Sequence, residues 1–279
     1  MLTYNQFLLK FLAVNIIRGD KMAAITANLK EGLKYPLLDN KKFLIVYVLN
    51  LLIFALIILS NYKIILNFSN LQNPVITINT ILSLISPEVI LGIIASIIIS
   101  IILKGYSYKL IQSGINHSKE LPDFNIDLIV LAFKLIIVDF VYAIIPILFL
   151  ILGSNNSALL SIGYILFIIL GLISIIAEAH VVKTGNLKCA FEFGDIFELI
   201  QSFGILNYIG AYIFYEFTYI IISFVLAILL LILIFILIPF GILTLLIVSI
   251  LTLSLLSTFI LISKYYVYGT LYDLMNKSE

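Results

Sequence analysis

Five ionisable residues that stand in or beside long apolar stretches of the chain are the candidates for chemistry: Lys134, Asp139, Glu178, His180 and Glu216. An ionisable side chain inside a membrane span is a candidate for a proton or ion relay, because burying its charge in lipid is costly. The stretch AFKLIIVD, which ends at Asp139, is the clearest case. The alternative is that Lys134 and Asp139 lie near the membrane surface, where a lysine stem can rest in lipid while its ammonium group reaches water.

The other three residues are each open to two interpretations. Glu178 and His180 close one apolar stretch, which favours a hydrated pair at the membrane surface; the alternative is a pH-sensitive gate, because histidine titrates near neutral pH. Glu216 is hydrated if its helix begins at the surface. If that helix is tilted, Glu216 is buried, and Asp139 or a lysine from a neighbouring unit is its expected partner.

Residues that could support catalysis are poorly placed. His117 and His180 are far apart in the sequence, and neither has a cysteine or acidic partner at a common metal-ligand spacing. Cys189 is the single cysteine, which excludes an intrachain disulfide and a multi-thiolate metal site. The chain contains no zinc-protease helix, nucleophile elbow, phosphate loop or dinucleotide fingerprint. We therefore expect a protein that is not an enzyme and has no cofactor or metal.

The composition places these residues in a membrane protein. Hydrophobic residues make up 63% of the 279 residues and charged residues only 11%, whereas about a quarter of the residues of soluble domains are charged. A net charge of +1 gives no reason to expect a nucleic-acid partner. A helix needs about 20 apolar residues to cross the hydrocarbon. Six stretches approach or exceed that length: 43–60, 87–103, 134–153, 158–180, 211–238 and 242–263.

The basic residues predict the orientation of these spans. Lysine and arginine accumulate on the cytoplasmic side of short loops. Fourteen of the 16 basic residues lie before the first span, in the second and fourth connections, or in the C-terminal tail. The remaining connections hold only Lys63, and Lys134 is unassigned. The sequence therefore predicts a cell-membrane protein with both termini in the cytoplasm.

A weak internal repeat suggests how the spans are grouped. A similar six-residue segment precedes the first, third and fifth spans: KYPLLD, KLIIVD and SFGILN. The segments that follow the second, fourth and sixth spans also resemble one another. We predict a single domain over 22–279 with pseudo-repeats at roughly 22–117, 118–188 and 189–279. The fold class is an all-α integral membrane protein with six transmembrane helices, arranged as three helical hairpins that are each preceded by an amphipathic interfacial helix. Residues 1–21 are an N-terminal extension, either a surface helix or the product of a start codon assigned too early.

Tyrosines gather where the predicted spans leave the bilayer, and Tyr106, Tyr108, Tyr265, Tyr266 and Tyr268 are the main examples. An aromatic belt explains this pattern, because the ring can sit among headgroups while the hydroxyl reaches water. The alternative is an aromatic-lined cytoplasmic vestibule.

Four segments carry a resemblance to a known family. They are EGLKYPLLD (31–39), GYSYKLIQSGINHSKELPDFNIDLIVLAFK (105–134), FEFGDIFELIQSFGILNY (191–208) and YVYGTLYD (266–273). Together they resemble the domain of unknown function 4013 family of archaeal and bacterial membrane proteins. The resemblance implies a multi-spanning membrane protein with no established reaction and no assigned catalytic residues.

Two functions from different classes fit these observations. One is a transporter- or channel-like protein whose path lies between the three units and includes Asp139 and possibly Glu216. The other is a non-catalytic membrane scaffold that shapes the bilayer or recruits a partner. Membrane lipids are the partners common to both.

Overall fold

The structure is a computed structural model that describes residues 21–69 and 87–277. The predicted N-terminal extension, apart from its last residue, lies outside the described residues, as does the connection at 70–86. Residues 21–34 form a helix, called here the N-terminal helix. The following helices are α2 (Asn40–Ser69), α4 (Pro87–Ile115), α5 (Leu128–Leu152), α6 (Ser157–Thr184), α7 (Phe193–Phe203), α8 (Ile205–Leu237) and α9 (Ile242–Asn276). Short 3-10 turns are η1 (Tyr35–Leu37), η2 (Gly153–Asn155), η3 (Leu187–Phe191) and η4 (Ile238–Phe240).

Among the described residues, six helices are long and apolar enough to cross a membrane: α2, α4, α5, α6, α8 and α9. This confirms the prediction of an all-α, multi-pass membrane protein. The two predicted breaks are also present, because η2 separates α5 from α6, and η4 separates α8 from α9. Asn156 caps α6 by accepting hydrogen bonds from the backbone N–H groups of Ala158 and Leu159. Gly241 follows η4 with a φ of 90°, a conformation that glycine adopts without strain.

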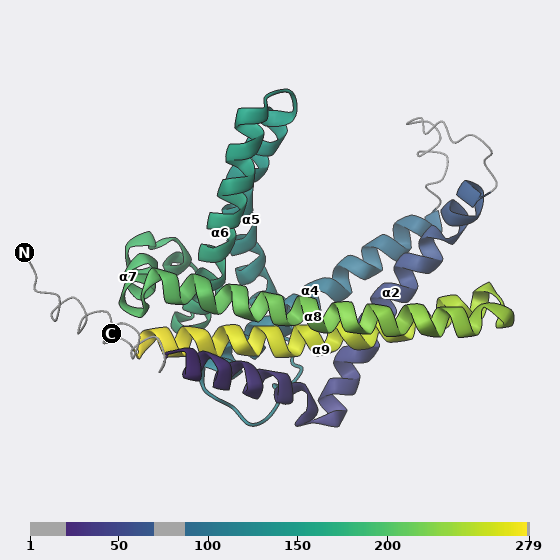
Figure 1. The fold of residues 1–279 in the computed structure, drawn as a ribbon, viewed down its shortest axis with the longest axis horizontal. Helices are drawn as coiled ribbons and strands as arrows, with labels where there is room; N and C mark the ends of the chain where they lie inside the picture. The colour runs from purple at the N-terminus through teal and green to yellow at the C-terminus, as the bar shows by residue number, and fades with distance from the viewer. Residues whose placement is uncertain (1–20, 70–86, 278–279) are drawn as a thin grey trace, which may run out of the picture.

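Successive spanning helices pack in pairs, α2 with α4, α5 with α6, and α8 with α9. In Figure 1, α8 and α9 run side by side, while the α5–α6 pair and the α2–α4 pair point away in different directions. Helix α4 joins the pairs because it also contacts α5 and α9. The interpretation of these pairs as repeats of one unit stays a prediction.

The predicted surface helices differ from unit to unit. The N-terminal helix and α7 precede the first and third pairs, and α7 is amphipathic, with Ile196 and Phe203 buried and Asp195 and Glu198 exposed. Before α5, however, residues 118–127 form an irregular segment, so the helix predicted there is wrong.

Contacts made by the irregular segment explain why it is not helical. Leu121 is buried in the core, and the ring of Phe124 stacks on Tyr106 with centroids 4.4 Å apart. The ammonium group of Lys42 bonds the carbonyl of Leu121 and lies 2.8 Å from the Asp123 carboxylate. The hydrogen bond from Lys42 lowers the pKa of the Asp123 carboxyl below its usual value. Tertiary contacts thus hold the segment extended against helices α2 and α4.

The core is rich in tyrosine, and the aromatic-belt prediction is wrong for most of the tyrosines that suggested it. Tyr106, Tyr108, Tyr266 and Tyr268 are buried inside the protein. The Tyr266 ring stacks on Tyr35 with centroids 3.8 Å apart, and its hydroxyl donates to Glu31. Such packing is possible because the phenol hydroxyl finds acceptors within the protein. Burial also raises the pKa of the Tyr35 hydroxyl, which donates a 2.5 Å hydrogen bond to the carbonyl of Glu120.

Helices α4 and α9 cross at a pair of glycines. A Cβ atom on Gly269 would lie 2.1 Å from the carbonyl oxygen of Ile111 and 2.9 Å from the Cα of Gly114. A Cβ atom on Gly114 would lie 2.1 Å from the carbonyl oxygen of Tyr266. Glycine has no side chain, so the two helix backbones can approach this closely only because a glycine lies on each side of the crossing. Both helices extend more than ten residues beyond the predicted ends of their membrane spans, and this crossing lies in those extensions.

Candidate functional site

A cluster of three charged residues joins α4, α5 and α6. The ammonium nitrogen of Lys104 lies 2.7 Å from a carboxylate oxygen of Asp139 and 2.7 Å from a carboxylate oxygen of Glu178. The Glu178 side chain is only 7% exposed, that of Lys104 is 17% exposed and that of Asp139 is 47% exposed. Lys104 also lies 5.6 Å from the centre of the Tyr265 ring on α9. Two of the five predicted residues, Asp139 and Glu178, therefore meet at one lysine.

This cluster is closed by its own contacts. Lys104 is the cation that neutralises the buried Glu178, and removing one member of such a pair would leave an uncompensated buried charge. Among the described residues, no buried side-chain nitrogen or oxygen lacks a hydrogen-bond partner. The polar atoms of this cluster are already paired within the protein, which favours a structural ion pair over a ligand-binding site.

A small pocket lies beside Asp139, between α5 and α6. Its volume is about 180 Å³, and Asp139 and Ser174 contribute the polar side chains besides the Tyr142 hydroxyl, which donates to the carbonyl of Ala190. Since a water molecule takes up about 30 Å³ of liquid volume, the pocket has room for only a few waters. It lies within one predicted unit, not between the units where a transport path was expected.

The Asp139→Asn variant tests whether this carboxylate matters for stability. Asp139 is half exposed, and Lys104 keeps Glu178 as a partner when Asp139 loses its charge. We expect the free energy of unfolding to fall by about 1 kcal/mol or less, as for exposed ion pairs. Thermal unfolding in detergent measures the change. A loss of several kcal/mol would contradict this assignment and would indicate that Asp139, and not Glu178, is the main partner of Lys104.

Glu216 forms a second ion pair, between α8 and α9. Its two carboxylate oxygens lie 2.8 and 3.0 Å from the ammonium nitrogen of Lys264, and the hydroxyl of Tyr268 donates a hydrogen bond to the same carboxylate. Asp139 is not its partner. The partner is a lysine, as one alternative predicted, but it belongs to the same predicted unit and not to a neighbouring one.

Lys134 and His180 contact other groups. The ammonium group of Lys134 donates a 2.8 Å hydrogen bond to the carbonyl of Gly185, just after the end of α6, where a cation is favourable. The Nδ1 atom of His180 lies 2.7 Å from the hydroxyl of Tyr272 on α9. The structure thus does not bring all five predicted residues together, because Lys134, His180 and Glu216 lie outside the cluster around Lys104.

Sequence reasoning missed one group of possible metal ligands. His180, Cys189 and Glu192 each offer an atom, and these atoms all lie within 4.8 Å of one another. The spacing of these residues matches no common metal motif, which is why the sequence alone predicted no metal site. The only sequence signal is Gly185, a residue suited to reversing the chain between His180 and Cys189.

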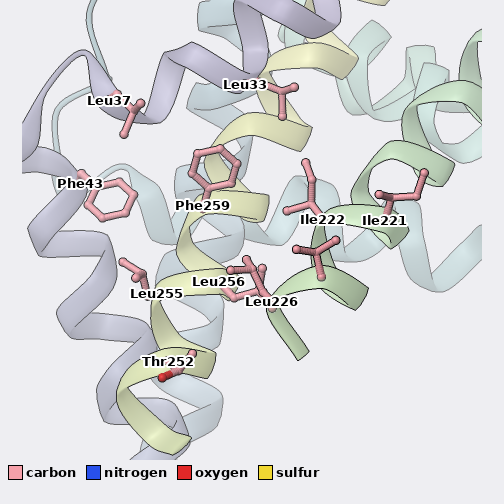
Figure 2. A pocket seen from close by; sticks show the side chains of 11 residues that line it. Leu33, Leu37, Phe43, Ile221, Ile222, Leu226, Thr252, Leu255, Leu256 and Phe259 are labelled. Atoms are coloured by element: carbon pink, nitrogen blue, oxygen red, sulfur yellow. The ribbon is translucent and has the colours of Figure 1, made fainter. Parts of the chain in front are cut away.

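The sequence also gave no sign of an apolar groove of about 680 Å³. Figure 2 shows its lining side chains, which come from the end of the N-terminal helix, η1, α2, α8 and α9. Thr252 is the single residue with a polar side chain in this lining, and its hydroxyl donates to the carbonyl of Val248. Such residues look the same as lipid-facing ones in a sequence, because only the packing of distant helices makes them line a groove.

Comparison with known proteins gives one match. A family model described as "Protein of unknown function (DUF4013)" matches residues 88–233, from the start of α4 through most of α8. The matched part contains Lys104, Asp139, Glu178, His180 and Glu216. No curated protein and no solved structure matches the chain.

Proposed function

The chain belongs to the DUF4013 family of proteins of unknown function, and we propose that this member is a transporter-like, non-catalytic membrane protein that binds a phospholipid. The observation that carries the proposal is the apolar groove in Figure 2. The ion pairs around Lys104 and Lys264 are closed, and the pocket at Asp139 is small. These features favour an apolar cargo over an ion.

The groove has the position and size for one acyl chain. Leu33 and Leu37 precede the first span, whereas Val225 lies near the middle of the apolar span Ile205–Phe240. The groove therefore extends from one membrane surface to about the centre of the bilayer, which is the depth of one leaflet. Its volume lies within the range of about 300–1,000 Å³ that is typical of small-molecule sites.

Selectivity for one phospholipid over another must come from contacts with the lipid headgroup. An acyl chain gains little by leaving other lipid tails, which are as apolar as the groove. Lys34 and Lys41 are exposed next to the lining residues Leu33 and Phe43, and neither forms an ion pair with another residue in the described part of the chain. Each lysine near a membrane surface attracts anionic lipid by about 1 kcal/mol. The geometry therefore favours an anionic phospholipid.

The distribution of basic residues supports an orientation with the mouth of the groove on the cytoplasmic side of the membrane. If the basic side faces the cytoplasm, both termini are cytoplasmic and the mouth of the groove opens in the inner leaflet of the cell membrane. The partner is then a lipid of that leaflet.

Lipid retention tests the groove. We expect wild-type protein in mild detergent to keep one bound phospholipid per chain, measured by native mass spectrometry. Leu256→Trp should weaken this retention, because the indole would project into the groove and obstruct an acyl chain, while Leu243→Trp at an exposed site of α9 should keep it. Replacing Lys34 and Lys41 with glutamine should reduce the preference for anionic over neutral lipid by about tenfold or more. Unchanged retention in Leu256→Trp would defeat the proposal.

A membrane scaffold is the second candidate. It is favoured by the dense contacts among α4, α5, α6 and α9, where buried tyrosines and ion pairs fix the helices together. Vesicles containing a fluorescent phospholipid separate the two functions. A transporter should speed exchange of that lipid between leaflets and lose the effect in Leu256→Trp, whereas a scaffold that only binds lipid should leave the exchange rate unchanged.

A further inference from the structure

We propose that His180, Cys189 and Glu192 bind a divalent transition-metal ion of the zinc class. Their ligand atoms, one from each side chain, lie within 4.8 Å of one another. In a tetrahedral zinc site, bond lengths of about 2.0–2.3 Å place ligand atoms roughly 3.3–3.8 Å apart. The three side chains therefore need to close by only about 1 Å, and the exposed Glu192 is free to make most of that movement.

The backbone brings these residues together through a sharp reversal after α6. Gly185 ends α6 with a φ of 73°, and its N–H group donates to the carbonyl of Val181. The Asn186 side chain then caps η3 by accepting a hydrogen bond from the N–H group of Lys188. The chain returns toward the last turn of α6, so Cys189 on η3 comes close to His180 despite their separation in sequence.

Contacts with α5 hold η3 in place. Ala190, next to Cys189, is fully buried, and its carbonyl accepts a 2.6 Å hydrogen bond from the hydroxyl of Tyr142. The Tyr142 ring packs against Phe191 and Phe193 on either side of Glu192. The core therefore holds the backbone at Cys189 and Glu192, while the exposed side chain of Glu192 can still adjust.

The ring of His180 is oriented by a residue that is not one of the three proposed ligands. Its Nδ1 atom lies 2.7 Å from the hydroxyl of Tyr272 on α9, which leaves Nε2 as the nitrogen that would bind the ion. Histidine ligands usually make such a hydrogen bond through the second ring nitrogen, which fixes the ring and its tautomer. Tyr272 thus takes the role of a positioning residue for the site.

The ligand chemistry selects the class of ion. A thiolate, an imidazole and a carboxylate suit zinc and its neighbours, whereas calcium and magnesium prefer oxygen ligands only. The two anionic ligands would balance the charge of a divalent ion. Lys183 and Lys188 are the basic residues nearest in sequence, and both are exposed. The ion would tie the end of α6 to η3 and the start of α7, and would leave one coordination position open for water.

Thiol reactivity of the full chain in detergent tests the site without a mutation. Cys189 is the only cysteine, so every thiol modification reports on it. We expect saturating Zn²⁺ to slow alkylation by a maleimide by at least about tenfold, because a metal-bound thiolate is shielded from the reagent, and a chelator should restore the rate. Co²⁺ should bind with a sulfur-to-cobalt charge-transfer band at one ion per chain. An alkylation rate that Zn²⁺ leaves unchanged would overturn the proposal.

Variants assign the ligands. His180→Asn and Glu192→Gln should each weaken Zn²⁺ protection of Cys189 by at least about tenfold, since each removes one of three ligands. His117→Asn is the matched control, because His117 contacts Asp273 and not the proposed site. If His180→Asn shows the same protection as wild type, the ion binds at Cys189 without His180 and the assignment fails. Should a variant fail to fold, the wild-type alkylation rate with and without Zn²⁺ still decides the question.

Discussion

Replacing Lys104 with methionine is expected to lower the free energy of unfolding by about 3–5 kcal/mol. Lys104 is the hydrogen-bonded cation beside Glu178, whose side chain is 7% exposed. Without the ammonium group, Glu178 keeps a buried carboxylate next to a half-exposed Asp139, and two neighbouring carboxylates repel each other. Either Glu178 takes up a proton or the contacts of α4 with α5 and α6 open, and both outcomes cost stability. Unfolding in a denaturing detergent measures the loss.

A double variant separates the charge effect from the packing effect. In Lys104→Met with Glu178→Gln, no buried charge remains, because glutamine is neutral and similar in size to glutamate. We expect this protein to recover more than half of the stability lost in Lys104→Met, as is found when both members of a buried pair are replaced. If the double variant is as unstable as Lys104→Met, the lysine acts through its packing against the Tyr265 ring instead.

The second large effect is expected at the crossing of α4 and α9. Gly269→Ala places a Cβ atom 2.1 Å from the carbonyl oxygen of Ile111, and a backbone atom cannot move aside as a flexible side chain can. Alanine gains about 1 kcal/mol over glycine in a helix, but forcing the two backbones apart should outweigh that gain. We expect a net loss of about 2–3 kcal/mol, in the range of overpacked cores.

Gly210→Ala is the matched control for this variant. Gly210 lies in α8, and a Cβ atom there would meet no atom within 4 Å. The same substitution should therefore stabilise the protein by up to about 1 kcal/mol through helix propensity alone. Thermal unfolding of both variants in one detergent compares them. Equal and small effects at the two positions would show that α4 and α9 do not cross as closely as described.

Sequence reasoning was most successful where a signal is local. Apolar runs of about 20 residues predicted the spanning helices, and the Pro239–Gly241 and Gly153–Ser157 segments predicted the turns between them. Both signals depend on the chain itself and on the solvent around it, so no knowledge of neighbouring helices is needed.

Features that depend on contacts between distant segments could not be predicted. Tyr106 and Tyr266 looked like headgroup anchors, yet their rings are buried and their hydroxyls bond to the carbonyl of Pro122 and to the carboxylate of Glu31. Lys104 directly follows an apolar run, and nothing in the sequence pairs it with its two acidic partners, because they lie on other helices. The groove and the His180–Cys189–Glu192 group depend on how the chain folds back on itself. Hydropathy says that a side chain is apolar, but it does not say whether lipid or protein lies against it.

The divergence of the helix pairs in Figure 1 has a mechanical consequence. Helix α4 approaches α5 and α9 closely in its C-terminal part, where Gly105 lies against Leu128 and Gly114 lies against Gly269. Helix α2 also contacts α9, whereas the far end of the α5–α6 pair points away from the other helices. A bilayer that is thinner or thicker than the hydrophobic length of a span makes that span tilt. We therefore expect the far end of the α5–α6 pair to change its tilt with the bilayer, whereas the contacts of α2 with α9 hold the α2–α4 pair more firmly. A bilayer of unusual thickness would thus act first on the contacts between α4 and the α5–α6 pair, which include the ion pairs of Lys104 with Asp139 and Glu178.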